Sequence, residues 1–346
     1  MATNTESVTL PTRELGQFGP FITEVGFGAW AIGGGGWAYA WGPQDDTESV
    51  AAIKHAVARG INWIDTAGVY GYGHSEEVVG RAVREIPVSD RPFVFTKGGM
   101  SWYEHDRFRE PLRDLRPATI HAEVDASLRR LGVDHIDLYQ FHQIDETGTP
   151  IEESWDALAR EVAAGKVRYA GVSNFSVELL ERAEEVRHVD SLQPPFSMIN
   201  REAGGELFKW AREHGTGVIV YSPMQSGLLT GGFSAQRMAR LAADDWRKRE
   251  AHFQEPNLSR NLALVEALKP IAARLGASLP ELAVAWVLGW SGVTGAIVGG
   301  RSREQVDGWI EAPQRKLTKE DMDDIAKAIV ATGAGSGPTN DPIPRE

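Results

Sequence analysis

Short apolar segments alternate with longer amphipathic segments along most of the 346-residue chain. This alternation is typical of a parallel α/β fold, in which each strand is followed by a helix. The segments predicted to be strands are Val25–Ile32, Trp63–Thr66, Phe93–Lys97, Ile136–His142, Tyr169–Asn174, Leu192–Pro195, Gly217–Ser222 and Gly295–Gly299. Because eight parallel strands close a β/α barrel, we predict a (β/α)8 TIM barrel.

The segments between and after the strands carry apolar residues at helical spacing, with polar residues on the opposite face. The predicted helices are Asp46–Arg59, Ser75–Glu85, Ile120–Leu131, Ile151–Ala164, Ser176–Glu185, Gly205–His214, Asn257–Leu275, Leu279–Gly289 and Asp321–Val330. The last of them is predicted to be an additional C-terminal helix on the surface.

A doubly wound open sheet is the alternative fold for the same alternation. Such a sheet would carry a glycine-rich turn after its first strand, leading directly into a helix whose amino end binds phosphate. The run Gly33–Gly36 follows the first predicted strand, but it leads into Trp37, Tyr39 and Trp41 rather than into a helix. A loop with aromatic residues at the mouth of a barrel fits this pattern better.

Two predicted connections are long, and long loops in a compact domain are often lids or binding loops. Gly98–Thr119 follows the third strand and Pro223–Pro256 follows the seventh. Residues 1–346 are predicted to form one catalytic domain. Its ends, residues 1–8 and 332–346, are expected to be flexible because they are rich in glycine, proline and small polar residues.

Composition narrows the class of partner. The chain has 36 basic and 48 acidic residues and a net charge of −12, which argues against nucleic acid or an anionic membrane as the main partner. It has no cysteine, so disulfides, thiolate nucleophiles and cysteine-bound metals are excluded. No apolar run reaches the roughly 20 residues of a membrane span, and the amino end has no signal-peptide pattern. We expect a cytoplasmic protein that acts on a small molecule; the sequence indicates neither a metal site nor an oligomeric state.

Four residues with acid–base chemistry lie at or just after the ends of the second, third and fourth predicted strands: Asp65, Tyr70, Lys97 and His142. A closed barrel brings such positions to one mouth. A phenol has a pKa near 10, and a neighbouring ammonium is expected to lower that pKa. Asp65 would make the burial of Lys97 tolerable, and His142 could orient a substrate oxygen or relay a proton. The set therefore indicates a tuned proton donor, although each residue alone also has an ordinary structural explanation as a cap, a packing residue or a surface residue.

Six long segments resemble the aldo-keto reductase superfamily, and the resemblance covers nearly the whole chain. The segments are GINWIDTAGVYGYGHSEEVVG, FVFTKGG, SLRRLGVDHIDLYQFH, GKVRYAGVSNFS, VIVYSPMQSGLLTG and AIVGGRSREQV. The resemblance implies that Tyr70 is the catalytic acid, that Lys97 and Asp65 support it, and that His142 orients the carbonyl group of the substrate.

The same resemblance implies a nicotinamide cofactor. Ser173, Asn174 and Gln193 would hold the carboxamide, and Tyr221 would stack on the ring, roles that suit amide, hydroxyl and aromatic groups. Turn formation and strand-end hydrogen bonding are the alternative roles for the three polar residues. Further cofactor contacts are implied after the seventh and eighth strands, at Ser222, Pro223, Gly227, Leu228, Gly299, Gly300, Arg301 and Gln305.

The segment after the eighth strand bears on the choice between NADPH and NADH. Glycine amides at a helix start favour an anion, and Arg301 and Arg303 add positive charge. In the family this segment grips the phosphate on the adenosine ribose, so we expect NADPH/NADP+, with NADH possible. Gly308 and Trp309 lie where family members often carry a Glu-Asn pair that contacts adenine. This departure weakens the expected preference for NADPH over NADH.

Five tryptophans are candidates for the substrate pocket, because aromatic side chains gather in the predicted mouth loops. Trp30 is expected to end the first strand. The other four are Trp37 and Trp41 in the loop that follows, Trp102 in the loop after Lys97, and Trp246 in the long seventh loop. Packing of the loops onto the barrel is the alternative role for each of them.

We therefore expect an NADPH-dependent reductase of an aldehyde, ketone or keto-sugar, with Tyr70 as the general acid. One alternative is an NAD(P)+-dependent dehydrogenase of a sugar, cyclitol or other secondary alcohol. Another is a cofactor-binding regulatory subunit without catalysis.

Overall fold

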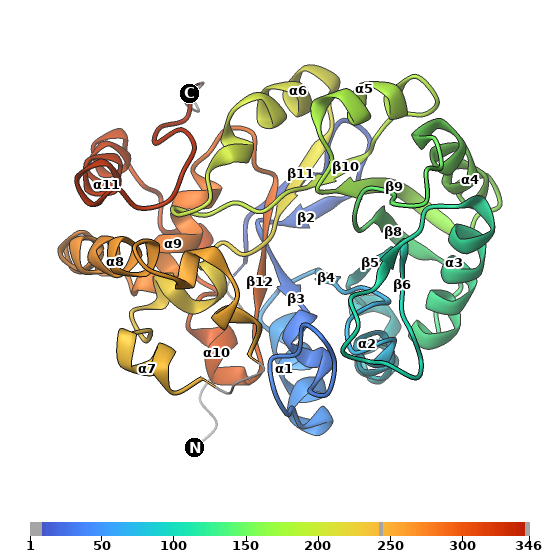
Figure 1. Ribbon diagram of the computed structural model, residues 1–346, viewed down its shortest axis with the longest axis horizontal. Coiled ribbons are helices and arrows are strands. Elements are labelled where there is room, and N and C mark those ends of the chain that lie inside the picture. The colour runs from blue at the N-terminus through green and yellow to red at the C-terminus, as the bar shows by residue number, and fades with distance from the viewer. Residues whose placement is uncertain (1–8, 242–244, 343–346) are drawn as a thin grey trace.

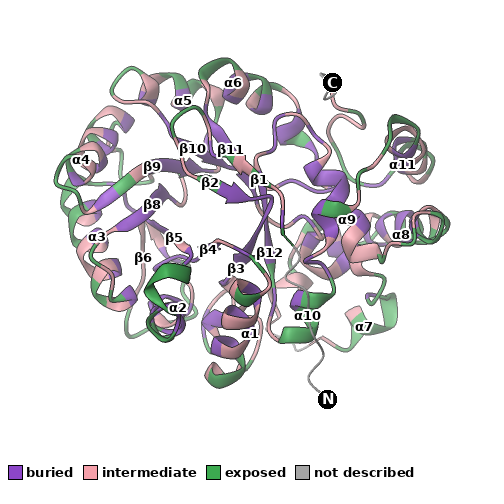
Figure 2. Cartoon of the chain, turned by 180° about the vertical axis from the view of Figure 1, so that it is seen from behind, coloured by how far each residue is buried: buried purple, intermediate pink, exposed green. Residues whose placement is uncertain are grey.

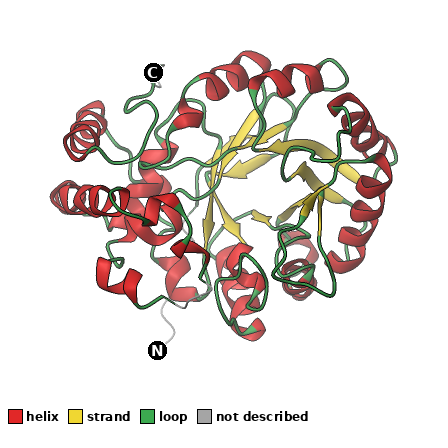
Figure 3. Cartoon of the chain, viewed as in Figure 1, coloured by secondary structure: helices red, strands yellow, loops and turns green. Residues whose placement is uncertain are grey.

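The computed structural model describes residues 9–241 and 245–342. Within these residues, eight parallel strands form a closed barrel, and helices surround it (Figures 1 and 3). In order around the barrel the strands are β3 (Val25–Gly28), β4 (Trp63–Asp65), β5 (Phe93–Gly98), β8 (Ile136–Phe141), β9 (Val167–Ser173), β10 (Ser191–Gln193), β11 (Gly217–Val220) and β12 (Gly295–Gly299). Pairing of β12 with β3 closes the ring, so the predicted (β/α)8 barrel is confirmed.

The helices lie close to their predicted positions. Those outside the strands are α1 (Asp46–Ala58), α2 (His74–Glu85), α3 (Pro117–Leu131), α4 (Ile151–Ala163), α5 (Val177–Glu184), α6 (Glu206–His214), α8 (Asn257–Arg274) and α9 (Leu279–Leu288). One short helix was not predicted, α7 (Ala235–Ala239), whereas α10 (Arg303–Asp307) begins where a helix start was expected after the eighth strand. The additional C-terminal helix is α11 (Lys319–Thr332), which packs beside α8 at the edge of the molecule (Figure 1).

A short hairpin that the sequence did not reveal closes the floor of the barrel. Its strands, β1 (Thr12–Glu14) and β2 (Phe21–Thr23), are three residues each, too short for a clear alternating pattern. Ile22 packs against Trp63 and Phe95 inside the barrel. The indole Nε1 of Trp63 donates to the carbonyl oxygen of Thr23 at 2.8 Å. The barrel is therefore filled and covered at this end, which leaves the carboxyl ends of the strands for a site.

Burial follows the expected layering. Figure 2 shows buried strands at the centre and exposed positions on the outer faces of the surrounding helices. Trp63 fills so much of the interior that Gly26 on the neighbouring strand has no room for a side chain, since an added Cβ would lie 2.1 Å from the indole ring.

Both long loops predicted from the sequence are present at the carboxyl end of the barrel. The loop after β5 contains a small antiparallel pair, β6 (Met100–Ser101) and β7 (Leu112–Arg113). The loop after β11 contains α7 and three 3-10 turns, Gln225–Thr230, Trp246–Lys248 and Ala251–Phe253. The first strand is shorter than predicted, because β3 ends at Gly28 and Trp30 begins a 3-10 turn that runs to Gly33.

The chain after α11 packs against the barrel, and the expected flexibility from residue 332 onward stays a prediction. Ala334 is 1% exposed. The backbone N–H of Arg201 donates to the carbonyl oxygen of Ser336 at 3.0 Å, and the Arg201 guanidinium donates to the carbonyl oxygens of Ala334 and Pro338 at 3.1 Å each. One buried guanidinium thus ties this segment to the barrel. Residues 1–8 and 343–346, also expected to be flexible, lie outside the described residues.

Among the helices of the described ranges, none is by itself long and apolar enough to cross a bilayer. Helices α8 and α9 meet the length and composition criteria only as a pair, and the two are bent by 88° relative to each other.

Candidate active site

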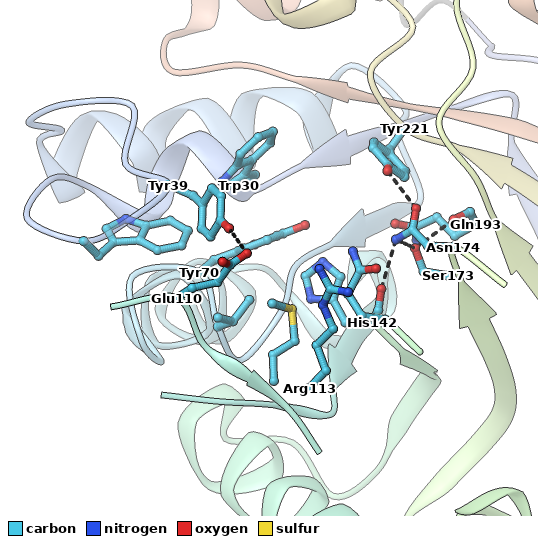
Figure 4. Close-up of a pocket in the computed structure, with 14 residues that line it drawn as sticks. Trp30, Tyr39, Tyr70, Glu110, Arg113, His142, Ser173, Asn174, Gln193 and Tyr221 are labelled. Atoms are coloured by element: carbon cyan, nitrogen blue, oxygen red, sulfur yellow. Dashed lines mark hydrogen bonds between the residues drawn. The ribbon is translucent and has the colours of Figure 1, made fainter. Parts of the chain in front are cut away.

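A cavity of about 200 Å³ opens at the carboxyl ends of the strands (Figure 4). Residues from several strand ends and from both neighbouring loops line it: Trp30, Trp37, Tyr39, Val69, Tyr70, Met100, Glu110, Arg113, His142, Gln143, Ser173, Asn174, Gln193 and Tyr221. Figure 4 shows Ser173, Asn174, Gln193 and Tyr221 at one end of the cavity, and Trp30, Tyr39 and Glu110 at the other. Tyr70 and His142 lie between the two ends.

An ion pair is buried beneath this cavity. Lys97 Nζ lies 2.5 Å from Asp65 Oδ1, and the two residues are 1% and 2% exposed. Lys97 also donates to the carbonyl oxygen of Thr66 at 2.8 Å, and Gln193 Nε2 donates to Asp65 Oδ2 at 2.9 Å. Burial raises the pKa of Asp65 and lowers the pKa of Lys97, while the attraction between the two groups opposes both shifts. A buried pair of this kind needs further hydrogen bonds, and here Thr66 supplies one to Lys97 and Gln193 supplies one to Asp65.

Tyr70 lies directly above the pair. The Lys97 Nζ is 5.2 Å from the centre of the Tyr70 ring, which is stacked on Trp30 at 6.2 Å and meets His142 edge-on at 5.5 Å. Burial raises the pKa of Tyr70 well above its ordinary value of 10, and the carboxylate of Asp65 adds to this shift. In the protein alone, burial and Asp65 set the direction of this pKa shift, and the expected lowering by Lys97 stays a prediction. Tyr70 consequently stays a phenol at neutral pH and can donate a proton.

His142 is poised to donate a hydrogen bond into the cavity. Burial lowers its pKa well below the ordinary value of 6.5, and the nearby Lys97 ammonium lowers it further. The imidazole is therefore neutral at physiological pH, with one N–H donor and one acceptor nitrogen. Its Nδ1 is buried and has no hydrogen-bond partner among the described residues. An unpartnered buried nitrogen beside Tyr70 can take up a polar atom of a ligand.

Hydrogen bonds link the opposite wall of the cavity to the ion pair. The Tyr221 hydroxyl donates to Asn174 Oδ1 at 2.8 Å, and Asn174 Nδ2 donates to Ser173 Oγ at 3.0 Å (Figure 4). Ser173 Oγ donates to the Gln193 carbonyl oxygen at 2.8 Å, and the Gln193 amide reaches Asp65. An amide oxygen accepts two hydrogen bonds, and Tyr221 uses one at Asn174, so a carboxamide N–H fits at the other. With the aromatic face of Tyr221, this wall fits a nicotinamide ring.

The turn that presents Tyr70 rests on a charged pair between α2 and α3. Glu76 is fully buried; it accepts from Arg130 Nε at 2.6 Å and from Thr96 Oγ1 at 2.6 Å. The Arg130 side chain lies against both ends of the turn: a Cβ added at Gly68 or Gly73 would stand 3.2 Å or 2.8 Å from it. The pair therefore forms the base on which residues 68–73 are folded.

The predicted substrate tryptophans fall into three groups. Trp30 and Trp37 line the cavity. Trp41 and Trp246 do not; they pack around Trp30, with ring centres 5.2 and 5.3 Å from it and 5.5 Å from each other. Trp102 also lies outside the lining, because it is stacked on Tyr72 at 5.4 Å, with the Arg130 guanidinium 5.9 Å from its ring. Trp102 thus has the loop-packing role that was its alternative.

Sequence reasoning missed several lining residues. Val69 and Gln143 are neighbours in sequence of Tyr70 and His142, so their positions could have been inferred. Met100, Glu110 and Arg113 lie in the loop after β5, whose length was noted but whose fold was not predictable. Tyr39 was noted as a loop aromatic, but its place in the cavity was not predicted.

Comparisons with known proteins agree with this architecture. The family model described as "Aldo/keto reductase family" matches residues 24–330. The chain belongs to the aldo/keto reductase family. Its members use NAD(P)H, and this protein is an NAD(P)H-dependent oxidoreductase.

Among the relatives of this aldo/keto reductase is Aldo-keto reductase YhdN of Bacillus subtilis (strain 168), 36% identical over 304 residues, 88% of each chain. Another is the NADH-specific methylglyoxal reductase of Escherichia coli (strain K12), 33% identical over 91% of this chain and 98% of the relative. Among solved structures, the glycerol dehydrogenase AKR11B4 from Gluconobacter oxydans is similar with a TM-score of 0.83 and 37% identity, over 95% of this chain and 98% of the other.

The remaining predicted cofactor contacts of the reductase lie outside the cavity lining, at the end of β12 or after β11 and β12. They are Ser222, Pro223, Gly227, Leu228, Gly299, Gly300, Arg301 and Gln305. Leu228 is fully buried in the core, and Ser222 and Gly227 have the left-handed φ angles of 57° and 97°. These angles belong to the sharp turn by which the chain leaves β11.

The Arg301 side chain is hydrogen-bonded to the loop that follows β3. Its Nε donates to Gln44 Oε1 at 2.5 Å, its Nη1 donates to the Trp41 carbonyl oxygen at 3.2 Å, and its Nη2 bonds to the Pro43 carbonyl oxygen. Gln44 Nε2 donates back to the Arg301 carbonyl oxygen at 3.0 Å. A guanidinium held by these acceptors is less available to a ribose phosphate. Trp309, at the position of the usual adenine contact, is 2% exposed and belongs to the core.

Replacement of Arg130 by Lys tests the base of the Tyr70 turn. Lysine keeps the charge near Glu76 but loses the planar guanidinium that packs against Gly68 and Gly73. We expect kcat for carbonyl reduction to fall about tenfold, because small displacements of a catalytic group are costly, while the dissociation constant of the cofactor is unchanged. The exposed neighbour Arg129→Lys is the control. An unchanged kcat in Arg130→Lys, with the same melting temperature, would contradict this role.

Replacement of Arg301 by Ala tests whether this side chain selects the cofactor. Because the guanidinium binds the loop at residues 41–44, we expect the KM values for NADPH and NADH to change by the same factor, and Gln44→Ala to behave alike. A side chain that grips a phosphate would instead weaken NADPH alone by about tenfold or more, since charge-assisted bonds of this type are strong. Steady-state kinetics with both cofactors distinguishes the two outcomes.

Proposed function

We propose that this enzyme reduces a small aldehyde or ketone to the alcohol, with Tyr70 as the proton donor. The observation that carries the proposal is the meeting of a protonated phenol, a neutral imidazole and a buried Lys97–Asp65 pair in one cavity. The cavity volume of about 200 Å³ is below the roughly 300–1,000 Å³ of sites for drug-sized ligands. A compact substrate therefore suits this site.

Each residue of the site has its own role in the proposed reaction. The bound cofactor supplies the hydride. His142 donates a hydrogen bond to the carbonyl oxygen and thereby fixes its direction. Tyr70 Oη donates its proton to the same oxygen as negative charge develops there. Lys97 stabilises the phenolate that remains, and Asp65 holds Lys97 beneath it.

The wall formed by Ser173, Asn174, Gln193 and Tyr221 would hold the nicotinamide ring against the cavity. We propose that NADPH and NADH are both accepted, because Arg301 is engaged elsewhere and Trp309 is buried. The relative from Escherichia coli is named as NADH-specific. This name supports the proposal that a family member of this type can use a cofactor that lacks the phosphate on the adenosine ribose.

Oxidation of an alcohol is the second candidate. The same groups serve it with Tyr70 as the base. The similar structure from Gluconobacter oxydans is titled a glycerol dehydrogenase, which favours a short polyol if this direction is used. The raised pKa of Tyr70 in the protein alone keeps the phenol protonated, which is the form that reduction uses.

A small-molecule substrate is consistent with the family. The absence of a nucleic-acid or membrane partner and a cytoplasmic location stay predictions from the sequence.

Replacement of Tyr70 by Phe tests the proposal. Loss of the proton donor should lower kcat for reduction of short aldehydes by about 10²–10⁴-fold, the usual contribution of general acid catalysis. Binding of the cofactor, followed by fluorescence, should persist. Tyr103→Phe is a matched control, because Tyr103 lies in the neighbouring loop under Arg109 and outside the cavity lining. If Tyr70→Phe keeps the turnover of the parent enzyme, the assignment fails.

A further inference from the structure

Two residues with a formal charge line the cavity, and neither has a part in the proposed mechanism. They are Glu110 and Arg113, both from the loop after β5. All other lining residues are apolar, aromatic or uncharged polar residues, with His142 neutral. A charged side chain that lines a substrate cavity can bind a polar group of the substrate. A substrate that displaces its water without replacing those hydrogen bonds binds less tightly.

Glu110 is oriented by an aromatic residue from a different loop. The Tyr39 hydroxyl donates to Glu110 Oε1 at 2.8 Å (Figure 4). Burial and this carboxylate raise the pKa of Tyr39 to about 12, so the hydroxyl keeps its proton. Because a carboxylate has two oxygens and about four acceptor positions, Glu110 can accept a further hydrogen bond from a ligand.

Arg113 offers the complementary donor. It lies on β7, which pairs with Met100 on β6, and its side chain extends into the cavity in Figure 4. Its Nη1 lies 3.3 Å from Glu146 Oε1, and its side chain is one-third exposed. A guanidinium has five N–H donors, so this ion pair leaves donors for a ligand oxygen.

The charges at this end of the cavity do not favour an anion. Glu110 and Glu146 together carry two negative charges against the one positive charge of Arg113. A carboxylate or phosphate on the substrate would be attracted by Arg113 but repelled by both neighbours. An alkyl group would leave Glu110 and Arg113 with fewer hydrogen bonds than they make to water. A hydroxyl group both donates and accepts, and so suits a cavity that is lined by an acceptor, Glu110, and a donor, Arg113.

We propose that Tyr39, Glu110 and Arg113 form a hydroxyl-recognition site that selects small, uncharged carbonyl compounds bearing a hydroxyl group near the carbonyl. The substrate hydroxyl donates to Glu110 and accepts from Arg113, while the carbonyl lies at Tyr70 and His142. This selection rests on the proposed carbonyl reduction and adds the chemical class of the substrate.

The test compares kcat/KM for three probes of similar chain length: glyceraldehyde, propanal and glyceraldehyde 3-phosphate. In the parent enzyme, glyceraldehyde should exceed propanal by about five- to tenfold, the effect of one or two hydrogen bonds near solvent, and should also exceed the phosphorylated probe. Glu110→Leu should lower kcat/KM for glyceraldehyde by about the same factor and leave propanal unchanged. Glu110→Gln should improve the phosphorylated probe relative to glyceraldehyde.

Two further variants separate recognition from structure. Tyr39→Phe removes the bond that orients Glu110, so it should give a smaller loss for glyceraldehyde and none for propanal. Glu104→Leu changes another exposed carboxylate of the same loop that does not line the cavity, and it should match the parent with all probes.

The outcomes are distinguishable. Equal kcat/KM for glyceraldehyde and propanal in the parent would overturn the hydroxyl site while carbonyl reduction stands. An equal loss for both probes in Glu110→Leu would also overturn it, because Glu110 would then serve the loop or the chemistry. Failure of the parent enzyme to reduce either aldehyde would contradict the proposed function and remove the basis of the site.

Discussion

The burial of the Lys97–Asp65 ion pair is the constraint on which the rest of the site depends. Two charges without water are tolerated when they meet each other and further hydrogen bonds support them. The fold places the two residues near the ends of adjacent strands, β4 and β5, and directs Gln193 from the opposite side of the barrel onto the free carboxylate oxygen. A closed barrel can supply such a third partner, because all strand ends face one mouth.

The same pair connects the two halves of the cavity. On one side, hydrogen bonds run from Gln193 through Ser173 and Asn174 to Tyr221, where the nicotinamide ring would lie. On the other side, Tyr70 covers Lys97 and meets His142. A change in the position of Asp65 would therefore reach the cofactor wall and the proton donor together. The loop after β5 lines the cavity with Glu110 and Arg113 and packs Trp102 on Tyr72, so it contacts both the substrate end and the turn that presents Tyr70.

The sequence predicted the barrel and placed the four acid–base residues at one mouth, because both follow from the repeat of strand and helix and from residues at strand ends. It did not predict the direction of the Tyr70 pKa, since desolvation depends on how closely Trp30 and His142 cover the ring. The role of Trp102 could not be predicted either, because its stacking on Tyr72 depends on the path of a loop whose sequence has no periodic pattern. Glu110 and Arg113 were missed for the same reason, and Arg301 was assigned by its charge without knowledge of its acceptors at residues 41–44.

The central claim is that burial and the Asp65 carboxylate keep Tyr70 a phenol, ready to donate. The most direct measurement is an ultraviolet difference titration of the parent enzyme against Tyr70→Phe, which isolates the ionisation of this one tyrosine. The account predicts no ionisation of Tyr70 up to its ordinary value of pH 10. Appearance of the Tyr70 phenolate near neutral pH would contradict it.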